Sequence, residues 1–149
     1  MFPHRGFVQR YGPKRAWREL VAPELDGYFG GCFERLCRQE LPALWAEEGV
    51  SASGEVGEYW DKDVQIDLVG VRDDGWIDLG ECKWGTPGSP AALAAELERK
   101  VVGHPNPKNR TLGKRLFFRA TPARFKAEGM KVHDLVDLHR AIAHGRAGD

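Results

Sequence analysis

Asp67, Glu81 and Lys83 are the residues of this sequence whose types and spacing could do chemistry. Two carboxylates held close together repel each other unless a positive charge lies between them. Mg²⁺ takes oxygen ligands from one or two carboxylates and keeps several waters. A nearby lysine would neutralise charge that develops on a transferred phosphate. These residue types predict a site for Mg²⁺ or Mn²⁺ that hydrolyses phosphodiesters, and the alternative is a solvated salt-bridge cluster at exposed strand ends.

Two strands joined by a tight turn would carry these residues. Residues 64–69 and 77–83 alternate apolar and polar side chains in β-branched company, which is typical of half-buried strands. Residues 73–75, Asp-Asp-Gly, supply the turn between them. Gly75 suits the positive φ that ends a three-residue hairpin loop.

The length of that turn sets the distance between the two acids. A three-residue loop pairs Arg72 with Trp76, and counting back along both strands places Asp67 opposite Glu81. Directly opposed residues on one sheet face have Cβ atoms about 4.5–5.5 Å apart. A two-residue loop would shift the pairing by one residue and separate the acids.

The remaining elements predict one α/β domain over residues 21–149, with residues 1–20 a basic arm or linker remnant. The fold class is α/β: a central four- to five-stranded mixed β-sheet flanked by helices. Helices are expected over residues 23–40, 90–102, 121–129 and 137–144, and further strands over residues 55–60, 114–120 and 130–135.

Composition limits the classes of function. The 149 residues carry a net charge of zero, so no global field steers the chain to nucleic acid. Locally, residues 108–126 hold seven basic residues and no acid. This run supplies the candidate phosphate-backbone contacts Lys108, Arg110, Lys114 and Arg115, and an ordinary charged surface is the alternative. Nucleic acid is therefore an expected partner, with DNA favoured over RNA.

The cysteines and the hydropathy bear on location. Three cysteines without metal-ligand spacing are typical of free thiols in a reducing cytoplasm. No apolar run approaches the length of a membrane span. We therefore expect a cytoplasmic protein with no membrane partner.

Asp67, followed on the next strand by Glu81-x-Lys83, resembles the motif of the PD-(D/E)XK nuclease-like (restriction-endonuclease-like) superfamily. That resemblance implies a four-stranded mixed sheet flanked by helices, and a further glutamate from the preceding helix, here Glu34. It implies catalytic roles for all four residues and metal ligation by the three acids. Ile66 stands where the motif often has proline.

A narrower resemblance, to the nuclease-like C-terminal domain of prokaryotic AAA- or STAND-type ATPases, covers about residues 20–137. This chain has no Gly-rich Lys-Ser/Thr phosphate loop, so it is not itself the ATPase. The resemblance implies an ATPase domain or chain as a partner, and a catalytically silent regulatory or protein-binding module as the alternative function. A nucleic-acid binder without chemistry is a third hypothesis. The resemblance rests on Tyr28-x-Gly30-x-x-Phe33-Glu34, Trp60-Asp61, Ile66-Asp67 and Gly80-Glu81-Cys82-Lys83-Trp84.

Several neighbouring residues have two readings. Glu34 could complete the outer shell of a metal or pair with Arg38, four residues on. Lys100 could contact phosphate, but a solvated lysine is favoured. Trp60 and Trp84 could stack on a base, but core packing is favoured. Gln65 is read as a polar strand residue, and the histidines receive no role.

Overall fold

The computed structural model describes residues 12–85 and 88–147 of the chain. One five-stranded sheet forms the centre, with strand order β1-β2-β3-β4-β5. Pairing is antiparallel from β1 to β3 and parallel from β3 to β5, so the sheet is mixed. The strands are β1 (Gly54–Trp60), β2 (Gln65–Arg72), β3 (Trp76–Lys83), β4 (Thr111–Phe118) and β5 (Lys131–His133).

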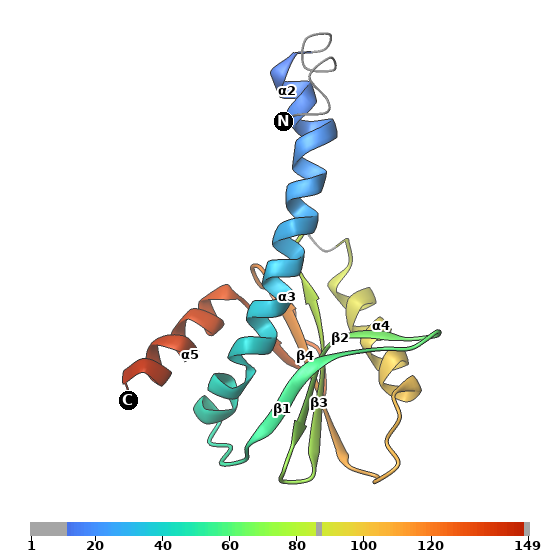
Figure 1. Cartoon of the computed structure of the whole chain (residues 1–149), viewed down its shortest axis with the longest axis vertical. Coiled ribbons are helices and arrows are strands. Elements are labelled where there is room, and N and C mark those ends of the chain that lie inside the picture. The colour runs from blue at the N-terminus through green and yellow to red at the C-terminus, as the bar shows by residue number, and fades with distance from the viewer. Residues whose placement is uncertain (1–11, 86–87, 148–149) are drawn as a thin grey trace.

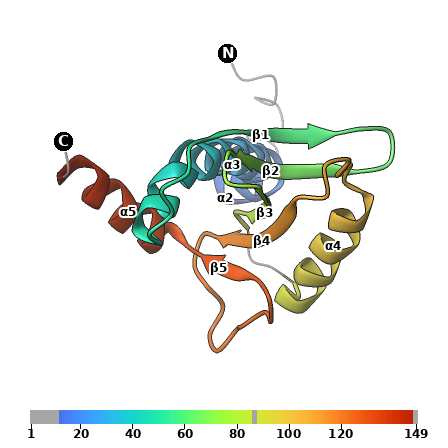
Figure 2. The ribbon, with the colours of Figure 1, turned by 90° about the horizontal axis from the view of Figure 1, so that it is seen from below.

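Helices cover both faces of the sheet (Figures 1 and 2). The long helix α3 and the C-terminal helix α5 lie on one face, and α4 lies on the other and makes the crossover from β3 to β4. The helices are α2 (Pro13–Ala16), the π-helical segment η1 (Trp17–Val21), α3 (Ala22–Glu47), α4 (Pro90–Gly103) and α5 (Leu135–Ala147). None of those in the described ranges is long and apolar enough to cross a membrane.

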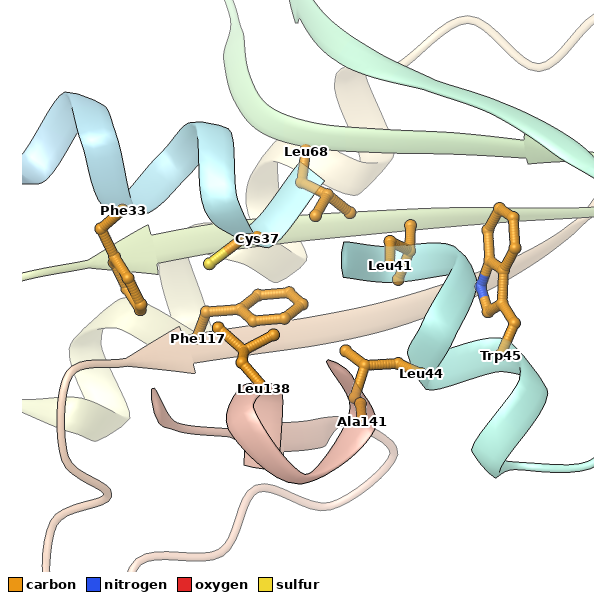
Figure 3. Packing of buried hydrophobic residues seen from close by; sticks show 9 residues of the cluster. All are labelled: Phe33, Cys37, Leu41, Leu44, Trp45, Leu68, Phe117, Leu138 and Ala141. Atoms are coloured by element: carbon orange, nitrogen blue, oxygen red, sulfur yellow. The ribbon is translucent and has the colours of Figure 1, made fainter. Parts of the chain in front are cut away.

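Two apolar cores hold these layers together. The first joins α3 and α5 to the sheet through Cys37, Leu41 and Trp45 of α3, packed against Leu68 and Phe117 (Figure 3). The second lies under α4. Its buried members are Ile66, Val69, Ile77, Leu79, Leu97, Val101, Leu116 and Phe118.

Gly70 shows why α3 can lie so close to the sheet. A Cβ added at Gly70 would meet Leu41 Cδ2 at 2.7 Å and Trp45 Cζ2 at 2.8 Å. A larger residue at this position of β2 would therefore push the helix away from the strand.

The expected elements differ from the observed ones in two places. Residues 13–20 were expected in an irregular arm, but they are helical and run into α3, which itself ends at Glu47 rather than near residue 40. Pro13 starts the helical segment, where its missing N–H costs nothing. Residues 1–11 lie outside the described residues.

The second difference concerns residues 121–129, which were expected to form a short helix and are turns. Arg124 has φ of 59° and Gly129 has φ of 73°, both in the left-handed region. A right-handed helix cannot pass through such residues. The other expected helices and strands are present, with ends shifted by a few residues.

Candidate functional site

A β-bulge places Asp67. Gly57 of β1 pairs with Val69 of β2, and Tyr59 pairs with Ile66. Between these two pairs β1 has one residue, Glu58, and β2 has two, Asp67 and Leu68. The extra residue reverses the alternation, so Ile66 belongs to the core under α4 and Leu68 to the core under α3. Plain alternation had put these two side chains on the same face, and that expectation is wrong. Bulges re-aim side chains in this way and are frequent beside active sites.

The hairpin register agrees with the expected three-residue loop. Leu68 pairs with Gly80, and three further pairs follow in the same register toward the turn. The ladder ends at this pair, one step before Asp67 and Glu81. Asp67 instead accepts a hydrogen bond at its Oδ2 from the backbone N–H of Cys82, with an N···O distance of 3.0 Å.

Arg38 of α3 holds the bulge from the other side. Its Nη1 donates a hydrogen bond of 2.8 Å to the backbone carbonyl of Asp67. The backbone of Asp67 is thus tied to a helix and its carboxylate is tied to β3. The bulged residue is positioned by tertiary contacts, which orient its side chain at the end of the sheet.

Glu81 is buried beside Asp67. Its side chain is 6% exposed, and Lys100 Nζ of α4 lies 2.9 Å from its Oε1. Burial, followed by the charge of Asp67, raises the pKa of Glu81 to about 8, although Lys100 opposes the rise. The Asp67–Glu81 pair therefore carries a proton near neutral pH in the absence of a metal ion.

Glu34 faces the same pair from α3. Burial and the charge of Asp67 raise its pKa above the usual range, while Arg38 lowers it. Within the described ranges Glu34 forms no ion pair with Arg38, since the guanidinium is turned to the Asp67 carbonyl. Asp67 thus lies close to each of the other two acids predicted from the sequence, Glu81 and Glu34.

The two lysines have exchanged the expected environments. Lys83 is exposed at the end of β3, and its side chain makes no hydrogen bond or ion pair within residues 12–85 and 88–147. Lys100 was read as solvated, but its side chain is 16% exposed and paired with Glu81 and Glu96. Lys100 follows Leu97, a core residue of the same helix, by three positions, and residues at this spacing lie on one face of a helix. This spacing could have predicted from the sequence that Lys100 points inward.

The acids suit only a metal ion that keeps most of its water. In the part of the chain that the structure describes, no group of three or more His, Cys, Asp or Glu is arranged to hold a metal. Two adjacent carboxylates, Asp67 and Glu81, are a sufficient protein donor set for Mg²⁺, which completes its shell with water and phosphate oxygens. They would not suffice for the closed tetrahedral shell of structural zinc.

The predicted nucleic-acid contacts lie elsewhere. Because β3 and β4 are parallel and Trp76 pairs with Thr111, Lys108 and Arg110 lie at the end of the sheet opposite Glu81. Lys114 Nζ is 2.8 Å from Glu98. Arg115 is 2% exposed, so its guanidinium is committed to protein groups and the expectation that it contacts phosphate is corrected.

Arg115 belongs to a buried polar network that the sequence did not reveal. Its Nη2 lies 3.2 Å from Asp78 Oδ2, and its Nη1 lies 2.7 Å from Glu48 Oε1. Trp45 Nε1 donates a 2.6 Å hydrogen bond to Asp78 Oδ2. Burial and the charge of Arg115 lower the pKa of the adjacent His133 to about 4. A cleft of about 460 Å³ lies beside this network, at the opposite end of the sheet from Asp67.

The cysteines are free. Cys32, Cys37 and Cys82 form no disulfide. A hydrogen bond with Cys37, together with burial, raises the pKa of the Cys82 thiol. The thiol next to Asp67 is therefore protonated and unreactive.

The fold and the site define an α/β protein with a five-stranded mixed sheet and a carboxylate pair at one end of it. A family model matches residues 1–100, and the chain belongs to that family, DUF234, described as archaeal and bacterial proteins of unknown function. The comparison with curated proteins found no match.

Proposed function

We propose that this protein is a metal-dependent nuclease of restriction-endonuclease-like fold that hydrolyses phosphodiester bonds in nucleic acid with Mg²⁺ or Mn²⁺. The observation that carries the proposal is the position of Asp67. It lies in a bulge, held at its backbone by Arg38 and at its carboxylate by Cys82, beside a buried glutamate. Bulges are frequent beside active sites, and carboxylates of raised pKa, such as Glu81, cluster at functional sites.

Each residue then has a role. Asp67 and Glu81 would hold the ion, and Glu34 would accept a hydrogen bond from one of its waters. The ion would supply a hydroxide at neutral pH and polarise the phosphate. Lys83, exposed two residues after Glu81, would neutralise charge on the phosphate oxygens as the bond to the leaving group breaks.

Lys100 compensates part of the negative charge of this site when no metal ion is bound. Its ammonium group and the proton on the carboxylate pair balance the charge when no divalent ion is bound. The ion pairs with Glu81 and Glu96 outweigh burial, which lowers the pKa of Lys100, and leave that pKa above its usual range. Lys100 is therefore a cation at neutral pH and cannot serve as the general base.

Calorimetric titration of Mg²⁺ and Mn²⁺ into the wild type, Asp67→Ala and Asp61→Ala tests the proposal. Asp61 is an exposed acid of the neighbouring hairpin loop and serves as the matched control. Its carboxylate accepts hydrogen bonds from the backbone of Asp63 and Val64 in that loop and from the hydroxyl of Tyr59 in β1. We expect saturable binding in the wild type and the control, and none in Asp67→Ala. The wild type and the control should cleave single- or double-stranded DNA or RNA, and Asp67→Ala should not. Absence of both metal binding and cleavage in the wild type would reject the proposal.

A second candidate function is a catalytically silent module that binds an ATPase domain or chain. The observation that favours it is the same ion pair, because Lys100 already compensates Glu81 without a metal. A silent domain would form the partner complex equally well after Glu81→Ala, and the wild type would lack metal-dependent cleavage.

A further inference from the structure

A row of aromatic rings runs from α3 to the end of β3. Tyr28 is 64% exposed and Phe29 is 42% exposed. The ring of Phe29 lies 5.6 Å from that of Tyr28 and 5.9 Å from that of Trp84, between centroids. Both residues belong to the N-terminal half of α3, and the N-terminal part of this helix projects beyond the sheet (Figure 1). Exposed aromatic residues that adjoin one another in this way mark binding surfaces.

Arg119 borders this row, and Lys83 lies beside it in the sheet with its side chain on the α4 face. The guanidinium carbon of Arg119 lies 5.1 Å from the centroid of the Trp84 ring, and the backbone N–H of Arg119 donates to the carbonyl of Lys83 at 3.2 Å. Both side chains are exposed, and neither forms an ion pair with any described residue. A cavity of about 370 Å³ adjoins Trp84 and Arg119.

These cations differ from the other basic residues of β4. Lys114 is paired with Glu98, and Arg115 with Asp78 and Glu48. The charges of Lys114 and Arg115 are therefore neutralised within the protein, whereas those of Arg119 and Lys83, at the carboxyl ends of β4 and β3, are available to a ligand.

We propose that this aromatic-basic strip, formed by Tyr28, Phe29, Trp84 and Arg119, binds a single-stranded segment of nucleic acid. Cations without acidic partners bind the phosphodiester backbone. Exposed rings stack on bases, and only unpaired bases offer their faces. Trp84 directly follows β3 and Glu81 lies three residues before it, so a strand lying on the strip reaches the end of the sheet that carries the carboxylate pair. The inference thus rests on the proposed function and assigns its substrate class.

Fluorescence anisotropy of a labelled single-stranded oligodeoxynucleotide, measured in EDTA over a series of salt concentrations, tests this inference without using metal binding or cleavage. We expect the wild type to bind, with affinity falling as salt rises. Arg119→Ala should reduce the slope of log K against log salt by about 0.7, the value for one lost phosphate contact on a single strand. Lys108→Ala removes the same charge from an exposed site at the other end of the sheet and should leave the slope and the affinity unchanged.

Tyr28 provides the test of stacking. Tyr28→Ala should weaken binding by about 5- to 100-fold, the range for one lost base–ring contact, and Tyr28→Phe, which keeps the ring, should bind like the wild type. A duplex of the same sequence should bind more weakly than the single strand.

Three results would overturn the inference: no binding by the wild type at low salt, equal losses in Arg119→Ala and Lys108→Ala, or equal affinity for duplex and single strand. The failure of the proposed function would look different. Metal binding and cleavage would then be absent, while oligonucleotide binding would still depend on Arg119.

Discussion

Lys100 Nζ lies 2.9 Å from Glu81 Oε1 and joins the crossover helix α4 to the central strand β3. The lysine that the motif supplies, Lys83, is exposed and unpaired within the described ranges, although it is only two residues from Glu81. The charge of the buried glutamate is thus balanced by a residue 19 positions away in sequence. Substitutions of the two lysines should have different consequences.

Lys100→Met should destabilise the protein at pH 9, where Glu81 is ionised in the wild type. Removal of one partner leaves a buried charge without compensation, and we expect the free energy of unfolding to fall by about 2–3 kcal/mol. Lys83→Met, at an exposed site, should change it by no more than about 0.5 kcal/mol. Urea denaturation measures both, and equal losses would mean that the ion pair is not the stabilising contact.

The contribution of Glu81 to the stability of the metal-free protein should fall as the pH rises from 5 to 8. The pKa of Glu81 is about 8 in the folded protein and has an ordinary value of 4.5. Between these values the folded state binds more protons than the unfolded state, so the free energy of unfolding decreases with pH. The slope from this group cannot exceed about 1.4 kcal/mol per pH unit.

Glu81→Gln removes that titration. The variant should gain stability relative to the wild type as the pH rises from 5 to 8, and Glu55→Gln, on the exposed edge strand, should not. Urea denaturation in EDTA at pH 5, 6, 7 and 8 provides the measurement. A constant difference between Glu81→Gln and the wild type would show that Glu81 titrates normally.

The hairpin could be predicted from sequence because its signals are local. Gly75 has φ of 89°, as the Asp-Asp-Gly turn requires, and the loop length then fixes the pairing of Leu68 with Gly80. The bulge at Asp67 could not be predicted in this way. It is held by Arg38, 29 residues earlier, and by Cys82, 15 residues later, and alternation along one strand contains no information on such contacts.

Charge runs were similarly misleading. The run from Lys108 onward looks uniform in sequence, yet Arg115 is 2% exposed and Arg119 is exposed. The difference arises from Asp78 and Glu48, which are distant in sequence and reach Arg115 through β3 and α3. Which cations of a run face solvent depends on tertiary pairing, so the burial of Arg115 could not be predicted from the run itself.

The buried network should tolerate little change. Asp78 is 2% exposed and accepts from Trp45 while it pairs with Arg115. Asp78→Ala leaves the Trp45 donor and one side of the guanidinium unsatisfied, so we expect the free energy of unfolding to fall by about 3–5 kcal/mol. Asp74→Ala, in an exposed turn, should cost much less. Thermal and urea denaturation distinguish them, and a loss below 1 kcal/mol in Asp78→Ala would contradict the role assigned to the network.

Gly113 provides a steric test of the same network. A Cβ added there would lie 2.2 Å from Asp78 Oδ1, whereas a Cβ at Gly57 would meet nothing within 4 Å. Asp78 cannot move away, because Trp45 and Arg115 hold its other oxygen. Gly113→Ala should therefore destabilise the protein by about 1–3 kcal/mol. Gly57→Ala should be neutral or stabilise it by up to about 1 kcal/mol, since alanine reduces the freedom of the unfolded chain. If urea denaturation gave both variants the same stability, Asp78 would have room to move, and the buried network would be less rigid than its hydrogen bonds indicate.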